Sequence, residues 1–232
     1  MDSPGGTIYH SDELYLAIKD YQEETGRPVC VYMGPYGASG AYYFSTAADR
    51  IYANRNTLTG SIGVTMGTYF DFSDTLDKLG IKTHTVDTGE MKSVGNGTDE
   101  LTASQKKYLQ GLVDESYEQF VGIISEEREI PLDDVKKLAD GRLYTAKQAL
   151  ELDLIDEIGS LEDSILLMRR DFGLWDCEFV ELYYDYESGR GIFDFLYYLT
   201  GKTAPQEARA QAMSESEADF PLKYLYTVME QE

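Results

Sequence analysis

The sequence predicts an α/β fold, in which strands and helices share a core. Two apolar segments rich in β-branched and aromatic residues, at residues 28–33 and 49–53, are typical of buried strands. Residues 11–25 carry apolar side chains on one helical face, and residues 41–48 form a helical run of mostly small residues. At 232 residues the chain is long enough to bury one large core or two small ones.

The chain opens with a loop, Asp-Ser-Pro-Gly-Gly-Thr at residues 2–7, ahead of the helix predicted over residues 11–25, which Gly26 ends. The Gly5-Gly6 pair is able to present backbone N–H groups at the helix entrance, as an oxyanion hole requires, although an ordinary turn explains the same residues. A loop of this kind normally has an element on each side. We therefore expect strands of the fold to precede residue 1 in the intact protein.

The strand predicted over residues 28–33 leads into a turn that carries Ser39. Small residues on both sides of this serine let the backbone approach a ligand. The helix that follows, at residues 41–48, would direct free N–H groups and its positive dipole end at the serine oxygen. This geometry suits a nucleophile. The alternative is that Ser39 only caps the helix and that the glycines only form a turn.

Two further segments place polar side chains among glycines. Residues 58–64 predict a strand or loop that passes close to another backbone or to a ligand, where Ser61 offers a hydroxyl, or else a tight sheet edge. The loop at residues 87–97 carries Lys92 as its only lysine. A loop lysine is most often a solvated surface charge, which is the alternative to a catalytic role.

The remaining elements are mainly helices whose apolar side chains recur at helical spacing. Thr145 is the expected N-cap of one of them. The predicted helices are at residues 72–79, 101–127, 131–139, 146–152, 161–172 and 192–199, and the predicted strands are at residues 81–86 and 177–186. Residues 203–219 contain little to bury, whereas residues 220–226 are apolar and aromatic, which indicates either a docking segment or a helix that closes the domain's own core.

Acidic residues dominate the charge of the chain. Asp and Glu outnumber Lys and Arg by 42 to 20, which gives a formal net charge of −22 and argues against nucleic acid or anionic lipid as a partner. Cys30 and Cys177 lie far apart in apolar segments, so we expect buried thiols rather than a disulfide or a metal site. No apolar run is long enough to span a bilayer, so we expect the chain as given to be soluble.

The candidate base for Ser39 is a lysine rather than a histidine. Neither His10 nor His84 has a context that would make it the base, although His10 lies close to the first loop and is still a candidate by position. A lysine replaces histidine when burial lowers its pKa enough to leave the amine neutral near the working pH. A Ser-Lys dyad is a known variant of the serine triad.

Five motifs, taken in order along the chain, resemble those of the signal peptide peptidase A family, bacterial serine-lysine membrane peptidases that share their fold with the ClpP protease and the crotonases. Each motif is weak alone, but the ordered set covers roughly residues 1–172. The motifs are DSPGG at residues 2–6, ASGAYY at residues 38–43, TGSIGV at residues 59–64, GEMKS at residues 89–93 and DGRLYTAKQA at residues 140–149.

The resemblance implies a repeated β-β-α superhelix and a role for each site residue. Ser39 is the implied nucleophile and Lys92 the implied general base, while the hydroxyl of Ser61 holds the lysine amine in place. The backbone N–H groups of Gly6 and Gly40 form the implied oxyanion hole. No metal and no cofactor takes part in the implied reaction.

The resemblance also implies an organisation of the chain and its partners. Residues 1–172 correspond to the catalytic domain, residues 173–202 to a strand and helix for oligomerisation, and residues 203–232 to an acidic tail with the apolar docking segment. The implied substrates are unfolded apolar peptides such as remnant signal peptides. Family members work as rings of subunits, anchored to the cell membrane by a segment absent here, with the catalytic domain outside the cytoplasm.

Two other functions compete with a serine endopeptidase. The first is a non-catalytic assembly subunit whose groove only holds peptides or the chain's own tail, from about Phe220 to Tyr226. A further hypothesis, separate from that one, is that this segment docks into the groove of its own or a neighbouring ring subunit and competes with substrate. The second is a crotonase-type acyl-CoA enzyme, which rests on fold analogy alone, since an acidic surface suits the CoA phosphates poorly.

Overall fold

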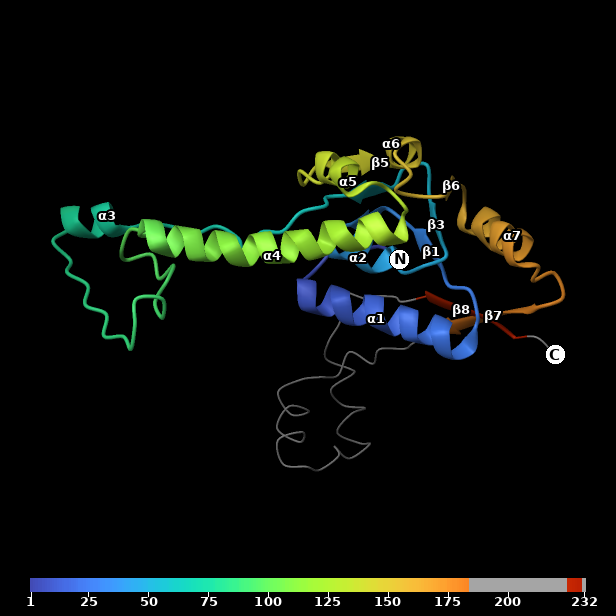
Figure 1. Ribbon diagram of the computed structural model, residues 1–232, viewed down its shortest axis with the longest axis horizontal. Helices are drawn as coiled ribbons and strands as arrows, with labels where there is room; N and C mark the ends of the chain where they lie inside the picture. Colours follow the sequence, from blue (N-terminus) through green and yellow to red (C-terminus); the bar gives the residue numbers. More distant parts are fainter. Residues whose placement is uncertain (184–224, 231–232) are drawn as a thin grey trace, which may run out of the picture. The chain divides into compact units, whose positions relative to one another are not determined.

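The computed structural model describes residues 1–183 and 225–230 of the chain. Helices and strands are interspersed along it, so the predicted α/β class is confirmed (Figure 1). The chain divides into two compact units, Met1–Gly173 and Leu174–Glu232. All of the candidate site residues belong to the first unit.

Two small sheets form the framework of the first unit. In one sheet β1 lies parallel to β3 and β3 lies parallel to β6, while in the other β2 is parallel to β4 and β4 is antiparallel to β5. The strands are β1 (Cys30–Met33), β2 (Tyr36–Ala38), β3 (Arg50–Ala53), β4 (Leu58–Gly60), β5 (Leu143–Thr145) and β6 (Glu157–Ile158). Because β2 and β4 are parallel neighbours, the residues that follow them, Ser39 and Ser61, leave the sheet side by side.

The first residues of the chain run beside β2. Ser3 forms a parallel bridge with Gly37, its amide donates to the carbonyl of Tyr36 at 2.9 Å, and its own carbonyl accepts from the amide of Ala38 at 3.2 Å. These bonds fix the start of the Asp-Ser-Pro-Gly-Gly loop against the strand that leads to Ser39.

The helices of the first unit match the expected ones within a few residues. Gly26 ends α1 in the left-handed conformation at φ 64°, and Thr145 caps α6 in a capping box with Gln148, both as predicted. The helices are α1 (Ile8–Thr25), α2 (Gly40–Ser45), α3 (Ser73–Lys78), α4 (Ala103–Glu127), α5 (Leu132–Leu138), α6 (Ala146–Glu151) and α7 (Leu161–Phe172).

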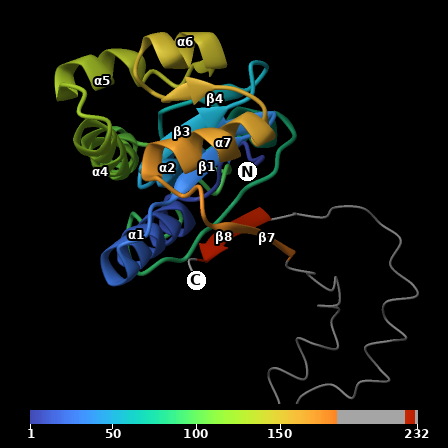
Figure 2. The same cartoon turned by 90° about the vertical axis from the view of Figure 1, so that its right-hand side faces the viewer.

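The core of the first unit is built around α2. Figures 1 and 2 show α2 between α1 and α4, and its two consecutive tyrosines, Tyr42 and Tyr43, are fully buried. The hydroxyl of Tyr42 donates to the carbonyl of Leu154 at 2.9 Å, which satisfies a polar group inside the core. Other large buried side chains are those of Met33, Ile51, Tyr52, Ile62, Phe120, Ile124, Leu154 and Ile155.

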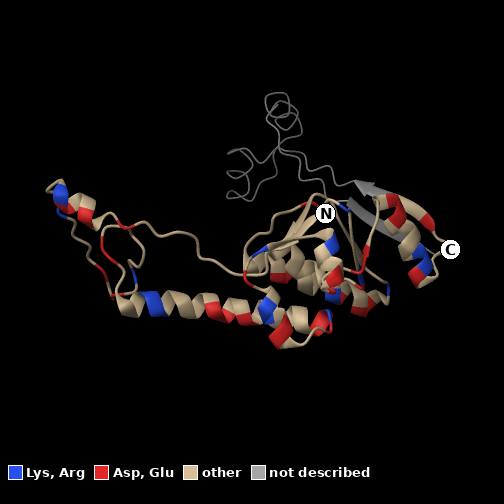
Figure 3. Ribbon diagram, turned by 90° about the horizontal axis from the view of Figure 1, so that it is seen from above, with Lys and Arg blue, Asp and Glu red and all other residues tan. Residues whose placement is uncertain are grey.

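Residues 64–102, which we term the α4 arm, lie beside the beginning of α4, at the end of that helix away from α2 (Figures 1 and 3). The strand predicted over residues 81–86 is wrong, since these residues pair with no strand in the described part of the chain. Their apolar side chains meet solvent, and Val86 is 98% exposed. A β-rich composition gives a strand only where a neighbouring strand satisfies its backbone, and the arm offers none.

The second unit contains an antiparallel strand pair, β7 (Glu178–Tyr183) and β8 (Leu225–Glu230). The predicted strand at residues 177–186 is confirmed as far as it is described. Leu225 and Tyr226 begin β8, so the helical alternative for that segment is wrong at these two residues. The helix predicted at residues 192–199, the linker at residues 203–219 and the start of the apolar tail at residues 220–224 lie outside the described residues.

Three further findings bear on the expectations from composition. Over the described residues, every helix is too short or too polar to cross a membrane. Neither cysteine of the described structure is in a disulfide, and Cys177 is buried and Cys30 partly buried. No group of three or more histidine, cysteine or carboxylate side chains in the described part of the chain is placed to hold a metal ion.

Candidate active site

Ser39 occupies a strained turn between β2 and α2. Its backbone has φ 53° and ψ −125°, a conformation that residues other than glycine rarely adopt. Two main-chain hydrogen bonds maintain this strained conformation. The amide of Ser39 donates to the carbonyl of Gly60 at 2.7 Å, and the carbonyl of Ser39 accepts from the amide of Tyr43 at 2.9 Å. A serine on such a strand-to-helix elbow is held at the start of a helix, as nucleophilic serines are in α/β-hydrolases.

Ser61 lies next to this elbow. It follows Gly60 directly, has a left-handed backbone at φ 49°, and its amide donates to the carbonyl of Arg142 at 2.7 Å. The Asp140 to Arg142 turn thus supports Ser61, and within that turn the hydrogen bond from Arg142 lowers the pKa of the Asp140 carboxyl. Among the described residues, neither the Ser39 nor the Ser61 hydroxyl forms a hydrogen bond, and both residues are partly exposed, so both hydroxyls are accessible to a substrate or an amine.

The two predicted oxyanion donors lie together. A Cβ atom on Gly40 would lie 3.0 Å from the amide nitrogen of Gly6 and would also overlap the Oγ of Ser11. A Cβ atom on Gly5, whose φ is +115°, would lie 2.7 Å from the Cβ of Ser39. Only glycines therefore permit this approach of the first loop to the elbow.

The amides of Gly6 and Gly40 are available to a ligand. Gly40 is the first residue of α2, where the helix itself supplies no acceptor. In the described part of the chain neither amide donates a hydrogen bond to a protein group. Two free N–H groups beside a serine match the requirements of an oxyanion hole.

His10 is engaged away from the elbow. Its Nδ1 lies 2.7 Å from the Oγ1 of Thr7, the N-cap of α1, and its ring packs edge-on against Tyr9. The structure gives the imidazole no contact with Ser39, so the geometry does not support His10 as the base.

Lys92 is exposed in the α4 arm, in a loop that is fastened to the beginning of α4. The carboxylate of Glu90 accepts from the hydroxyls of Thr102 at 3.1 Å and Ser104 at 2.8 Å, and the carbonyl of Glu90 accepts from the side chain of Gln105 at 3.0 Å. The amide of Lys92 donates to the carbonyl of Gly89 at 3.0 Å. The loop is therefore a local structure built on the first turn of α4.

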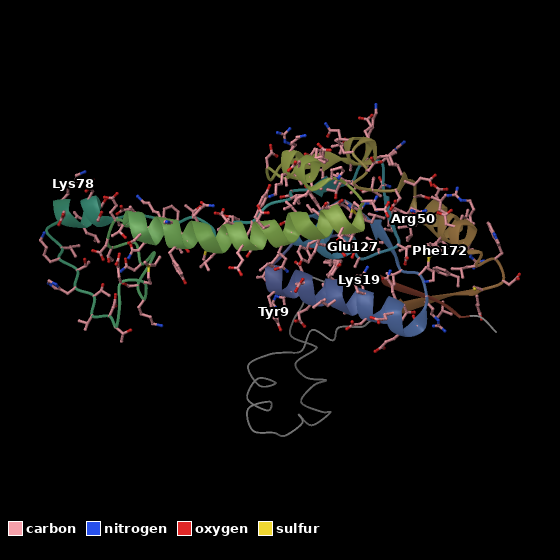
Figure 4. All side chains as sticks on the ribbon, viewed as in Figure 1. Tyr9, Lys19, Arg50, Lys78, Glu127 and Phe172 are labelled. Carbon is pink, nitrogen blue, oxygen red and sulfur yellow. The ribbon has the colours of Figure 1, made fainter. Side chains whose placement is uncertain are left out.

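The structure does not bring Lys92 to Ser39 within one chain. The elbow helix is bonded to α4 through Gln119, and at the helical rise of about 1.5 Å per residue Thr102 lies roughly 25 Å along the axis from Gln119. In Figure 4, Lys78 of the arm lies beyond the beginning of α4, whereas Glu127 marks the other end of that helix. Ser39, Ser61, Gly6 and Gly40 thus form one cluster, and Lys92 lies outside it.

Sequence reasoning missed three residues that surround this cluster. Asp12 on α1, Tyr43 on α2 and Gln119 on α4 meet in one hydrogen-bonded network behind the elbow. The position of Tyr43 one turn after Ser39 was visible in the sequence. Its partners were not, because they come from helices far away in the chain.

Comparison with known proteins assigns most of the chain to one family. The model of peptidase family S49 matches residues 21–174. A Methanocaldococcus jannaschii protein provisionally named as a protease is 34% identical over 86% of this chain and 62% of its own length. An Enterococcus faecium protein provisionally named signal peptide peptidase SppA is 33% identical over 78% of this chain and 52% of its own.

A plant protein shows the same similarity. The chloroplastic serine protease SPPA of Arabidopsis thaliana is 32% identical over 73% of this chain and 25% of its own length. The chain spans about half to three fifths of the length of the first relatives that it matches.

Proposed function

This chain belongs to peptidase family S49, and on that premise we propose that it is a serine endopeptidase that hydrolyses unfolded apolar peptides, such as remnant signal peptides. The observation that carries the proposal is the elbow, where a strained serine lies beside two backbone amides that have no hydrogen-bond partner among the described residues. The names of the similar proteins, which include a serine protease and a signal peptide peptidase, support the same reaction class.

The proposed reaction is acyl transfer in two steps. The Oγ of Ser39 attacks the peptide carbonyl while Lys92 takes the hydroxyl proton, and the amides of Gly6 and Gly40 donate to the oxyanion that forms. Collapse of the tetrahedral intermediate releases the amine with that proton and leaves an acyl group on Ser39. Water, deprotonated by Lys92, then releases the acid. Each oxyanion donor is worth about 3 kcal/mol of transition-state stabilisation by analogy with other acyl-transfer sites.

We further propose that Lys92 reaches Ser39 from a neighbouring copy of the chain. A lysine acts as a base only where it is shielded from water, and Lys92 is exposed on its own subunit and fastened to the remote end of α4. The α4 arm carries exposed apolar side chains, including those of Phe70, Phe72 and Leu79, which a second subunit would cover. Repeated head-to-tail contacts close into a ring when the rotation between neighbouring subunits completes a full turn, and we propose such a ring for this chain.

Membership of peptidase family S49 also guides our proposals for the detailed fold and for the location of the protein. The chain passes from the β1 sheet to the β2 sheet and, after α2, from β3 to β4, which supports a repeated β-β-α superhelix of the ClpP and crotonase kind. We propose that the protein is held at the cell membrane, with its catalytic part outside the cytoplasm.

The proposal is tested by labelling and cleavage together. The wild-type chain should react with a fluorophosphonate at Ser39 and cleave an apolar fluorogenic peptide, and Ser39→Ala should lose both activities. Lys147→Ala, which removes an exposed lysine of α6, serves as the matched control and should retain both. Wild-type protein that neither reacts nor cleaves would instead favour the non-catalytic assembly subunit.

A further inference from the structure

A hydrogen-bonded network joins three helices behind the elbow. The hydroxyl of Tyr43 on α2 donates to the Oδ1 of Asp12 on α1 at 2.5 Å and accepts from the Nε2 of Gln119 on α4 at 2.8 Å. The same Nε2 lies 3.2 Å from the Oδ1 of Asp12, so the three side chains close a triangle. At each of these three contacts a donor meets an acceptor of the correct kind.

The central residue of the network, Tyr43, is buried. Tyr43 is fully enclosed, with its ring 5.1 Å from that of Phe120 and 5.9 Å, edge-on, from that of Tyr15. Burial, reinforced by the bond to Asp12, raises the pKa of the Tyr43 hydroxyl well above its usual range. The hydroxyl therefore remains a donor to Asp12 at any pH at which a peptidase works.

The network is close to both oxyanion donors. Gly40 is the first residue of α2 and Tyr43 lies one turn further on, where its amide also binds the carbonyl of Ser39. Gly6 precedes α1 by two residues, and Asp12 lies just beyond the first turn of that helix. A bond between Asp12 and Tyr43 thus ties together the beginnings of the two helices whose entrances supply Gly6 and Gly40.

We propose that Asp12, Tyr43 and Gln119 are positioning residues that fix the distance between the amides of Gly6 and Gly40, and hence the shape of the oxyanion hole. This inference rests on the proposed function, since it assigns these residues to the same reaction. Hydrogen-bond donors stabilise an oxyanion only when they are already in place, and a displacement of about 1 Å costs roughly 100-fold in rate. Gln119 adds a direct link from this pair to α4, which carries the Lys92 loop.

The chain contains a matched control for the central residue. Tyr15 on α1 also donates its hydroxyl to a carboxylate of α4, that of Glu127, and burial raises its pKa as it does that of Tyr43. The bond from Tyr15 links α1 to α4 without touching α2. Tyr15→Phe therefore removes a comparable hydroxyl from the same interface and leaves the elbow helix bonded as before.

The experiment compares Tyr43→Phe and Tyr15→Phe with the wild type in kcat, KM, melting temperature and inhibition by a peptide aldehyde, whose adduct with Ser39 places an oxyanion in the hole. We expect Tyr43→Phe to lower kcat about tenfold or more with little change in KM, and to lower the affinity for the aldehyde inhibitor by a similar factor. Tyr15→Phe should lower the melting temperature comparably and leave kcat and the aldehyde affinity within about twofold of the wild type.

A second variant keeps the test decisive if Tyr43→Phe does not fold. Gln119 is exposed, so Gln119→Met removes only its Nε2 donor and leaves the bond between Tyr43 and Asp12 in place. It should reduce kcat and aldehyde affinity together, by a smaller factor than Tyr43→Phe does. Unchanged kcat and aldehyde affinity in the folded variants, or an equal loss in Tyr15→Phe, would overturn the inference while the peptidase proposal stands. Absence of Ser39-dependent cleavage in the wild type would overturn both.

Discussion

The amide nitrogen of Ser39 donates a 2.7 Å hydrogen bond to the carbonyl oxygen of Gly60. This bond continues the β2 and β4 pairing by one residue and holds the serine at the point where its chain turns into α2. Ser39, Gly60 and Ser61 all have positive φ values, of 53°, 80° and 49°. Strained backbone gathered at one place is characteristic of functional sites, where surrounding structure maintains it.

Substitution of Gly5 by alanine should damage the site directly. The new Cβ would lie 2.7 Å from the Cβ of Ser39 and 2.9 Å from the amide of Gly40, at a φ of +115° that alanine adopts poorly. We expect kcat/KM to fall about 100-fold, because both the nucleophile and an oxyanion donor must move. Steady-state kinetics on an apolar fluorogenic peptide measures this effect.

The control for Gly5→Ala is a glycine with free space around it. Gly111 lies on an exposed face of α4, and a Cβ added there would meet no other atom within 4 Å. Gly111→Ala should raise the free energy of unfolding by about 0.5–1 kcal/mol, since alanine favours a helix interior over glycine. Equal catalytic losses in the two variants would contradict the local explanation.

Removal of the Glu90 side chain should release the loop that carries Lys92. Glu90→Ala loses the bonds to Thr102 and Ser104, so we expect kcat to fall about tenfold, with a small change in melting temperature because the loop is exposed. Glu100→Ala is the matched control, since Glu100 also lies near the beginning of α4 but pairs only with Lys106 in the described structure. An unchanged kcat in Glu90→Ala would show that the hydrogen bonds from Thr102 and Ser104 to Glu90 are irrelevant to catalysis.

Cys30 should resist alkylation in the folded protein. Burial is the main cause that raises the pKa of its thiol from 9.0 to about 12, so the reactive thiolate is scarce at pH 9. Because the folded state binds the thiol proton more tightly, the stability contributed by this group is complete below about pH 9 and is lost as the pH rises toward 12.

The rate of iodoacetamide modification of the Cys30 peptide, followed by mass spectrometry at pH 9, checks this expectation. Modification should be slow in buffer and fast in denaturant. Equal rates in the two conditions would mean that the thiol is not shielded by the fold.

Local features of the sequence predicted local structure well. Gly26 ends a helix and Thr145 caps one because both effects depend on neighbours within a few residues. The turn at Ser39 was predicted for the same reason, from small residues between a strand and a helix. The strand at residues 81–86 was predicted wrongly, because pairing requires a partner that composition does not reveal.

In the candidate site, too, some features were expected from the sequence and others depend on contacts between distant segments. The approach of Gly6 to Gly40 was expected from motifs, and the structure brings them together through contacts between segments that are adjacent in the sheet. The remote place of Lys92 depends on the length of α4 and on bonds from Glu90, which no motif encodes. The network of Asp12, Tyr43 and Gln119 depends on the packing of three helices and likewise has no local signature.

The most direct test of the account is to mix two inactive variants. Ser39→Ala and Lys92→Ala should each fail to cleave the apolar reporter peptide. If Lys92 serves Ser39 of a neighbouring subunit, co-assembly of the two in equal amounts should restore about a quarter of wild-type activity, the share of interfaces that pair an intact serine with an intact lysine. No recovery on mixing would contradict a dyad shared between subunits, and full activity of Lys92→Ala alone would contradict the dyad itself.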